Sequence, residues 1–343
     1  NSNRPDLKIP ELLKTYLNSN RISSHDIATD GVYMTELSKS DQAKYIGWQG
    51  AFYNIAKIVA SGGLVYLAGW LVKRFGGVEG ASGEVVYEAN VHAWMIVMFV
   101  MAIVMISLGL YHTRMLPSGG AATSEATSFK ETFDKLVEVI LDFFKKKHIW
   151  YYIAFIILYR FAEGFVMKIV PLFLKAGREI GGLGLSEQEI GIYYGTYGAA
   201  AFVLGSLLAG YYISHRGLKK TLFSLCCTFN LPFIAYTLLA IYQPTSGMLI
   251  GGAIVLEYFG YGFGFVGLTL FMMQQVAPGK HQMAHYAFAS GIMNLGVMLP
   301  GMVSGFVSDW LGYRDFFIFI LFATIPAFLI TYFVPFTYPD TKK

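Results

Sequence analysis

Charged residues and cysteines are scarce in this sequence. Lysine, arginine, aspartate and glutamate together make up 14% of the 343 residues, whereas soluble globular domains contain about 25%. Hydrophobic residues reach 55%, and the mean hydropathy is +0.49. The cysteines are Cys226 and Cys227, neighbours inside an apolar run, which excludes a disulfide framework. This composition excludes an ordinary soluble protein and predicts a membrane protein with several helical spans.

Several catalytic and nucleotide-binding motifs are also missing. The sequence contains no Walker loop, no dinucleotide-binding fingerprint, no serine nucleophile elbow and no zinc-protease helix. We therefore expect neither an enzyme nor an ATP-driven pump, and no cofactor. His25 with Asp26, and His281 with His285, have no third ligand beside them, so no metal site is expected. The net charge of +4 is small, which argues against nucleic-acid binding.

The beginning of the chain is unusual. A signal peptide is absent and the first residue is Asn1 rather than methionine. Residues 1–21 are polar and contain two prolines, so we interpret them as an atypical or truncated N-terminal segment. Residues 22–37 are too short to cross a membrane alone and indicate the last part of a helix whose start is missing. Asp26 and Asp30 lie on one face of that helix.

Eight apolar stretches follow, each long enough to cross a bilayer, which takes about 20 helical residues. They are residues 45–72, 92–111, 149–174, 190–213, 221–242, 248–276, 286–307 and 316–334. The sequence therefore predicts an all-α polytopic membrane protein with about eight complete spans plus part of one.

Residues 112–148 form the one long connection between spans. Its apolar residues lie near helical spacing: Phe129, Phe133, Leu136, Ile140 and Phe144. Ser128 and Glu131 fit a capping box at the start of this stretch, and three lysines end it. The pattern predicts an interfacial amphipathic helix that joins two helical bundles.

The basic residues of the loops predict the orientation of the chain. Alternate loops on one side hold most of the lysines and arginines, including Lys145, Lys146 and Lys147. The loops on the other side hold only Lys73, Arg74, Lys175, Arg178 and Arg314. The positive-inside rule therefore predicts that the connection and the C-terminus face the cytoplasm.

A glycine pattern recurs where spans end. Two glycines separated by six residues occur at residues 69–76, 210–217 and 305–312. If the spans are grouped in threes, each pair closes the middle helix of a group. The first helices of the groups then carry the buried ionisable residues. Polar groups at the interface of three-helix repeats are typical of secondary transporters.

Residues 149–175 contain the most informative of these ionisable residues. Arg160 and Glu163 lie inside the apolar stretch, where a charge costs about 2.5–3.5 kcal/mol near the bilayer centre. They must therefore face protein or a water-filled cavity. Their i, i+3 spacing places them on one helix face, where they can form an ion pair. Glu257 and Lys57 lie near the middle of two other spans, so we include both as candidate site residues.

The sequence resembles a known transporter family at several motifs. Residues 305–314 (GFVSDWLGYR) resemble the loop motif of the major facilitator superfamily, and residues 210–220 keep its glycines and bases but have Ser214 in place of the acid. SHDIATDG at 24–31, SGG at 61–63, LYRFAE at 158–163 and LE at 256–257 are similar to AmpG-like muropeptide permeases. The similarity extends from about residue 23 to residue 339.

This resemblance implies the organisation and the activity of the chain. AmpG-like permeases are twelve-helix transporters that import anhydro-muropeptides with the proton gradient. Residues 22–111 would be helices 4–6 of the N-terminal bundle, residues 112–148 a cytoplasmic linker, and residues 149–343 the C-terminal six-helix bundle. The family's transport acids correspond to Asp26, Asp30 and Glu163. Lys57 departs from the family and puts the solute, more than the fold, in doubt.

We therefore predict a proton-coupled secondary transporter of a bacterial inner membrane that imports anhydro-muropeptides or a related sugar-peptide solute. Its partners would be the solute, protons and membrane lipids. Protonation of Glu163 or its helix-4 counterpart would loosen a bridge to Arg160 or Lys57. The alternatives are a non-transporting membrane scaffold or sensor, an inactive remnant, and a facilitator for another solute. For the Arg160–Glu163 pair, the alternative is a structural ion pair between helices.

Overall fold

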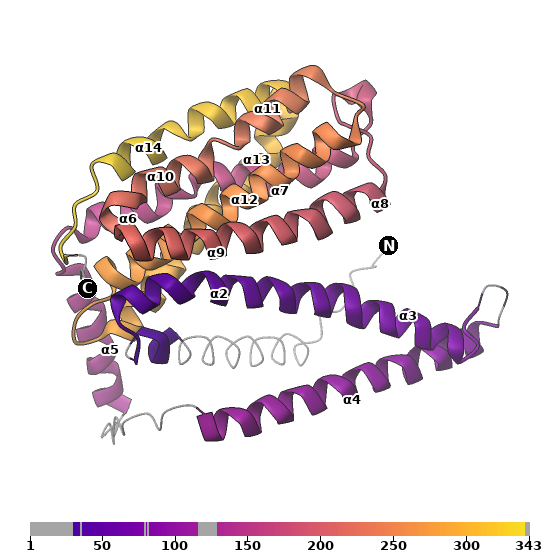
Figure 1. The fold of residues 1–343 in the computed structure, drawn as a ribbon, viewed down its shortest axis with the longest axis horizontal. Coiled ribbons are helices and arrows are strands. Elements are labelled where there is room, and N and C mark those ends of the chain that lie inside the picture. The colour runs from indigo at the N-terminus through magenta and orange to yellow at the C-terminus, as the bar shows by residue number, and fades with distance from the viewer. Residues whose placement is uncertain (1–29, 35, 79, 81, 116–128, 340–343) are drawn as a thin grey trace, which may run out of the picture. The chain divides into compact units, whose positions relative to one another are not determined.

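The computed structural model describes residues 30–34, 36–78, 80, 82–115 and 129–339 (Figure 1). Asp26, His25, Ser128 and the predicted segment 1–21 lie outside these residues. Every regular element in the described part of the chain is a helix. The chain forms two compact units, residues 52–125 and the remainder. The predicted boundaries at residues 111 and 148 stay predictions.

The unit of residues 52–125 contains three consecutive helical segments and one long helix that packs on the last of them. The consecutive segments are the end of α2 (Lys39–Ile58), the π-helix η1 (Val59–Leu64) and α3 (Val65–Arg74). The long helix is α4 (Gly83–Met115). Small and branched side chains fill the contact between α3 and α4: Ala68, Leu71, Ala93 and Val97. The predicted spans 45–72 and 92–111 fall on these helices.

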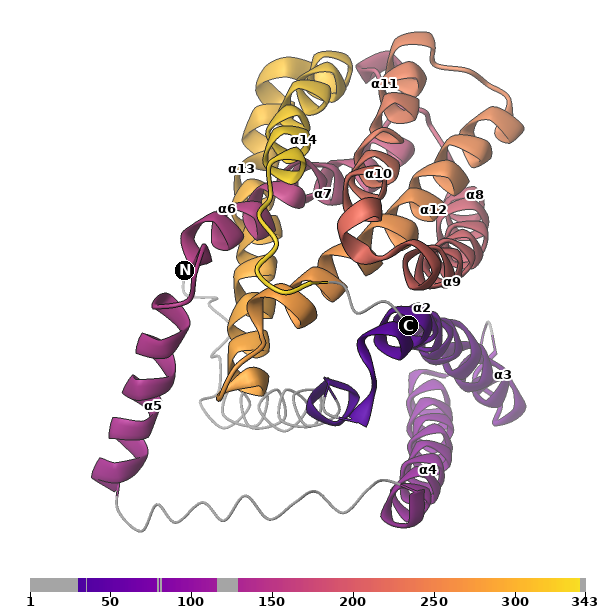
Figure 2. The same cartoon turned by 60° about the vertical axis from the view of Figure 1, so that its left-hand side comes forward.

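The other unit contains the start of α2 and the C-terminal helices (Figures 1 and 2). Its helices before residue 217 are α5 (Phe129–Phe144), α6 (Ile149–Tyr159), α7 (Phe161–Lys175), η2 (Arg178–Ile180), α8 (Glu187–Ile190), η3 (Gly191–Tyr197) and α9 (Gly198–Arg216). The later ones are α10 (Leu218–Asn230), α11 (Phe233–Tyr242), α12 (Gly247–Phe271), η4 (Met272–Val276), α13 (Gln282–Ala323) and α14 (Ile325–Tyr332).

Five helical stretches of the described residues are long and apolar enough to cross a membrane. They are Gly83–Met115, Gly191–Arg216, Leu218–Tyr242, Gly247–Val276 and Gln282–Tyr332, the last of which contains two predicted spans. The predicted span 149–174 is divided at Arg160 into α6 and α7, of 11 and 15 residues. Each part alone is shorter than the about 20 residues that a crossing needs. The predicted all-α polytopic membrane fold is confirmed.

The recurring glycine pattern has a backbone cause. The second glycine of each pair has a positive φ: 88° at Gly76, 83° at Gly217 and 71° at Gly312. Residues with a Cβ rarely adopt this left-handed conformation, so glycine is needed to end the helix there. Gly312 lies inside α13, where its non-helical backbone conformation separates the predicted spans 286–307 and 316–334. The repeat therefore marks three equivalent helix ends.

Close glycine contacts hold the C-terminal helices together. A Cβ at Gly205 of α9 would collide with the carbonyl oxygen of Phe259, and one at Gly262 of α12 would collide with that of Phe202. Gly164 of α7 similarly meets Val297 and Pro300 of α13. Small residues let membrane helices approach closely, so van der Waals contact replaces the hydrophobic driving force that lipid removes. These contacts fix α7, α9, α12 and α13 around the candidate site.

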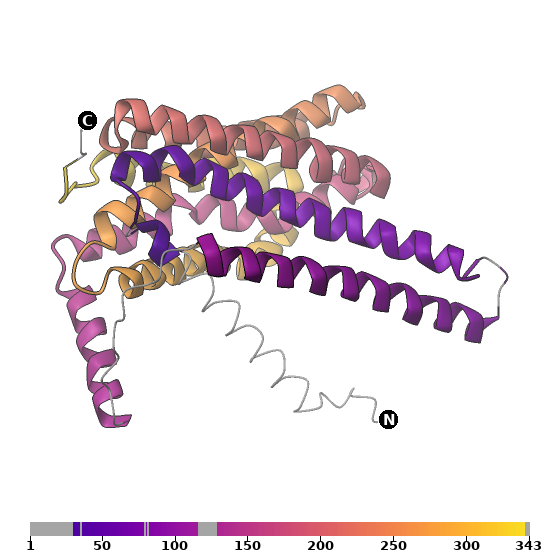
Figure 3. The ribbon, with the colours of Figure 1, turned by 60° about the horizontal axis from the view of Figure 1, so that its bottom comes forward.

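The amphipathic helix predicted between the bundles is α5, and it docks on the start of α13 and the end of η4 (Figure 3). Lys146 donates hydrogen bonds to three backbone carbonyls, those of Val276, Ala277 and Pro278, at 2.6–3.0 Å. A lysine there satisfies carbonyls that the end of a helix leaves without donors. Partial burial lowers the pKa of Lys146 to about 8, with Asp142 acting in the opposite direction.

Candidate functional site

Arg160 and Glu163 form a buried, bidentate ion pair. Arg160 Nε donates to Glu163 Oε2 and its Nη2 donates to Oε1, both at 2.6 Å. The two side chains are 7% and 3% exposed. Arg160 itself lies at the break between α6 and α7, with φ −106° and ψ 5°. The i, i+3 pairing predicted from the sequence is confirmed, and the helix break that accompanies it was not predicted.

Aromatic residues of α12 enclose this pair. The guanidinium carbon of Arg160 lies 5.2 Å from the centre of the Phe265 ring, a cation–π distance. Tyr261 also interacts electrostatically with Arg160. The hydroxyl of Tyr159, the residue directly before Arg160, donates to the carbonyl oxygen of Gly264 at 2.9 Å. The pair is therefore held between α7 and α12 with its charge shielded from lipid.

Glu257 is a second carboxylate of the same region, on α12. The hydroxyl of Tyr236, on α11, donates to Glu257 Oε2 at 3.3 Å. The Glu257 carboxylate interacts electrostatically with Glu163, which carries the same charge. Among the described side chains, no lysine, arginine or histidine nitrogen lies within 4 Å of it. Glu163 thus has a cation as its partner, whereas Glu257 has a tyrosine.

Tyrosines of three helical segments interact with Glu257. Tyr194 of η3 and Tyr258 of α12 meet edge to face, with ring centres 4.9 Å apart. Tyr194 and Tyr236 both interact electrostatically with the Glu257 carboxylate. The sequence analysis did not single out Tyr236, because its contact with Glu257 joins helices 21 residues apart. The arrangement offers one negative charge surrounded by hydroxyl groups and aromatic faces.

Asp30 belongs to the helical stretch of residues 30–34 and contacts α2. Gln49 Nε2 donates to Asp30 Oδ1 at 3.0 Å. Tyr286 of α13 also interacts electrostatically with Asp30. Gln49 is a polar partner that the sequence did not indicate. The structure therefore places Asp30 beside Gln49 of α2 and Tyr286 of α13.

Two other candidates cannot be placed by their side chains. Asp26 lies outside the described residues. Lys57 belongs to α2 in the unit of residues 52–125, and its side chain is outside the described part. Its proposed pairing with an acid therefore stays a prediction.

His281 has acidic neighbours that the sequence analysis missed. Its Nε2 lies 3.5 Å from Asp142 Oδ2 and 3.7 Å from Glu138 Oε1, both on α5. This arrangement of one histidine and two carboxylates has the donor types of a metal site. Lys280 Nζ, however, already pairs with Glu138 at 2.7 Å. We interpret the group as a polar contact that attaches α5 to α13.

Comparisons with known proteins agree with this architecture. The sequence profile of the Major Facilitator Superfamily matches residues 31–277 and, in a second match, 164–343. The chain is 24% identical to a transporter named AmpG 2 from Rickettsia typhi over 217 residues, which are 59% of this chain and 48% of that protein. It is also 24% identical to the anhydromuropeptide permease of Escherichia coli K12 over 195 residues, 57% of this chain and 38% of that protein.

A third relative, an uncharacterized protein of Haemophilus influenzae, is 24% identical over 261 residues, 74% of this chain and 59% of that protein. The chain therefore spans about half the length of the curated relatives that it matches. The predicted resemblance to AmpG-like proteins is confirmed. Because the profile covers most of the chain, this protein belongs to the major facilitator superfamily of membrane transporters.

Proposed function

We propose that this secondary transporter couples the inward movement of an anhydromuropeptide, or a related sugar-peptide solute, to protons across a bacterial inner membrane. The observation that carries the proposal is the buried Arg160–Glu163 ion pair, which interacts electrostatically with a second, half-buried carboxylate, that of Glu257. Ionised carboxylates are costly inside a membrane bundle and typically mark proton or substrate pathways. The C-terminus would face the cytoplasm, as the distribution of basic loop residues predicts.

The charges suggest how a proton acts on this site. Arg160 neutralises Glu163 through two hydrogen bonds, whereas Glu257 accepts a hydrogen bond from the uncharged Tyr236. Protonation of Glu257 would remove the like-charge repulsion between the two acids. It would also leave the site electrically neutral, since the remaining Glu163 charge is matched by Arg160. Proton binding would then favour one of the two bundle arrangements of an alternating-access cycle.

The solute assignment rests on different support. The relative from Escherichia coli is named an anhydromuropeptide permease. Tyr194 and Tyr258 provide aromatic faces and hydroxyl groups beside Glu257, which suit the apolar faces and hydroxyls of a sugar. We also include Asp26, Asp30 and Lys57 among the residues proposed for proton coupling or substrate binding.

Uptake into proteoliposomes tests the proposal. We expect the full-length protein to accumulate labelled anhydromuropeptide when an inward proton gradient is imposed, and to stop when a protonophore collapses the gradient. Glu163→Gln should abolish accumulation, because Arg160 would lose its charged partner. Glu179→Gln is the matched control, since Glu179 is an exposed acid of η2 far from this pair in the chain.

The outcomes separate the parts of the proposal. Accumulation that ignores the gradient would contradict proton coupling. Failure to take up the anhydromuropeptide, with uptake of another solute, would contradict the solute assignment alone. Full activity of Glu163→Gln would contradict the assigned role of the buried pair.

A further inference from the structure

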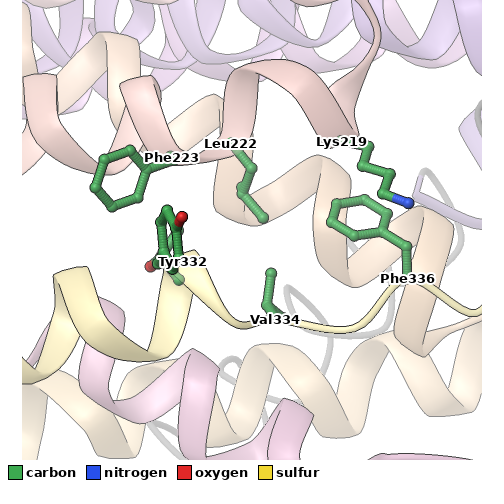
Figure 4. A pocket seen from close by; sticks show the side chains of 7 residues that line it. Lys219, Leu222, Phe223, Tyr332, Val334 and Phe336 are labelled. Carbon is green, nitrogen blue, oxygen red and sulfur yellow. The ribbon is translucent and has the colours of Figure 1, made fainter.

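The pocket between α10 and the end of α14 does not suit a sugar-peptide solute (Figure 4). Its volume is about 220 Å³, which is below the about 300–1,000 Å³ of typical small-molecule sites. Most of the side chains that line it are apolar: Leu222, Phe223, Tyr332, Val334 and Phe336. Polar groups that recognise the solute are therefore expected elsewhere on the membrane-spanning helices.

Lys168 is a cation in the middle of α7 that does not belong to the buried ion pair. Its side chain is exposed, and it lies seven residues, about 10 Å, before the end of the helix at Lys175. Among the described side chains, no carboxylate oxygen lies within 4 Å of its ammonium group. Glu163, the acid of α7, is held by Arg160 through two hydrogen bonds. The charge of Lys168 is therefore available to another anion.

The side chain of Lys168 packs against α13 at Gly301. A Cβ at Gly301 would lie 3.5 Å from the Cγ of the lysine and 3.7 Å from its Cε, so the missing side chain makes room for the lysine. Gly301 lies eleven residues, about 16 Å, before the helix end at Gly312. The ammonium group is one bond beyond Cε and therefore lies near Gly301, well below that end of the helix.

The face of α13 beside Lys168 carries a second polar residue. Asn294 lies seven residues, or two helical turns, before Gly301 and is exposed. Met298 lies between them on the same face. A lysine in contact with lipid is costly, so a lysine inside a span faces protein or a water-filled path. An apolar surface with a few polar groups is also typical of small-molecule sites.

Lys168 follows the Arg160–Glu163 pair along α7. Five residues separate it from Glu163, about 7.5 Å along the helix axis. Gly164, directly after Glu163, packs on Val297 of α13, and Lys168 lies one turn further along the same face of α7. A solute made of sugar and peptide units is long enough to reach both places.

We propose that Lys168 binds a carboxylate of the transported solute. The inference rests on the proposed function and deepens it: the ion pair responds to the proton, and Lys168 selects a solute whose peptide part is anionic. The lysine ammonium is a compact charge with three hydrogen-bond donors, which suits a carboxylate. Because Arg160 is neutralised by Glu163, Lys168 supplies positive charge that the pair does not.

Uptake kinetics of the full-length protein in proteoliposomes test this role. The probes are labelled anhydromuropeptide with free peptide carboxylates and, as a competitor, the same solute with those carboxylates converted to amides. We expect the wild-type chain to prefer the free acid by about tenfold, the weight of a hydrogen bond between charged groups. Lys168→Gln should raise the KM for the free acid by that factor and lose the preference, whereas Lys168→Arg should keep most of it.

The control is Lys175→Gln, because this exposed lysine ends the same helix. It should keep the wild-type preference for the free acid. Normal uptake with an unchanged preference in Lys168→Gln would overturn this inference alone. Absence of uptake by the wild-type chain would overturn the proposed function and, with it, this inference.

A second measurement tests whether the lysine faces water. Lys168→Cys should react with a water-soluble thiol reagent that does not cross membranes, above the background given by Cys226 and Cys227 in the wild-type chain. Aminoethyl methanethiosulfonate, which attaches an ammonium group to the new thiol, should then restore the preference for the free acid. Reaction no faster than the background would overturn the inference, since residue 168 would then face lipid or be covered by protein.

Discussion

Two ion pairs in this molecule have nearly the same N···O distance in opposite surroundings. The Arg160–Glu163 pair inside the C-terminal bundle has an N···O distance of 2.6 Å, and the Lys280–Glu138 pair that joins α13 to α5 has one of 2.7 Å. The side chains of the first pair are 7% and 3% exposed, and those of the second are 72% and 48% exposed. Distance alone therefore does not distinguish the pairs, but exposure to solvent does.

The difference in exposure indicates what each pair contributes to the stability of the fold. Water screens the exposed pair, and such pairs typically contribute little to stability. The buried pair is attracted through a less polar medium but has lost its hydration, so its net contribution to stability is not assured. Breaking it by removing one partner leaves an uncompensated buried charge. The transport role that we propose for this pair would account for its position.

The largest effect is expected when the buried pair is broken. Arg160→Ala leaves Glu163 without its cation, and such a loss typically costs about 3–5 kcal/mol. Thermal unfolding of the detergent-purified protein should therefore move to a clearly lower temperature. The double variant Arg160→Met with Glu163→Met should recover much of the stability but no transport. An unchanged unfolding temperature for Arg160→Ala would contradict the description of the pair as tightly buried.

An intermediate effect is expected at Lys146, which is partly buried where α5 meets η4. Lys146→Ala removes the donor to three carbonyls, so α5 should become less firmly attached. Hydrogen exchange of peptides covering residues 129–144 should accelerate. Gln282→Ala, a substitution of the first residue of α13, serves as the control. Unchanged exchange in Lys146→Ala would show that the lysine does not hold α5 in place.

The same lysine predicts a pH dependence with a defined sign. Its pKa in the folded protein is about 8, below the about 10.4 of an unfolded chain. Between these values the unfolded chain binds more protons, so stability should increase as the pH rises from about 8 to about 10. Lys146→Ala should remove this part of the pH dependence of unfolding. A slope that persists in the variant would assign it to another group.

The smallest effect is expected at the exposed pair. Lys280 holds the pKa of Glu138 below its usual range, mainly through the side-chain hydrogen bond. Its contribution is present at neutral pH and disappears as the pH falls through the lowered pKa. Because both groups are exposed, Lys280→Ala should leave the unfolding temperature nearly unchanged, and added salt should erase what difference remains. A decrease in unfolding temperature as large as that of Arg160→Ala would contradict the expected difference between the two pairs.

The part of the site that depends on local spacing could be predicted from the sequence. Arg160 and Glu163 are three residues apart, so one helix face brings them together whatever surrounds them. The paired glycines also marked helix ends correctly, because the backbone conformation at Gly76, Gly217 and Gly312 is a local property. Contacts between helices were harder to predict from the sequence. The Tyr236–Glu257 hydrogen bond and the acids beside His281 join residues that no short-range pattern relates.

The sequence by itself determined that this chain is a helical membrane protein and which ionisable residues lie within its apolar stretches, since both follow from the cost of placing polar groups in lipid. Only the tertiary structure decided which of those residues meet. Glu257 of α12 accepts a hydrogen bond from Tyr236 of α11, and Gly262 and Gly264 let α12 pack closely against α9 and α10. Close approach between helices depends on the shapes of surfaces that are distant in the chain, and that information lies in the packing rather than in any one segment.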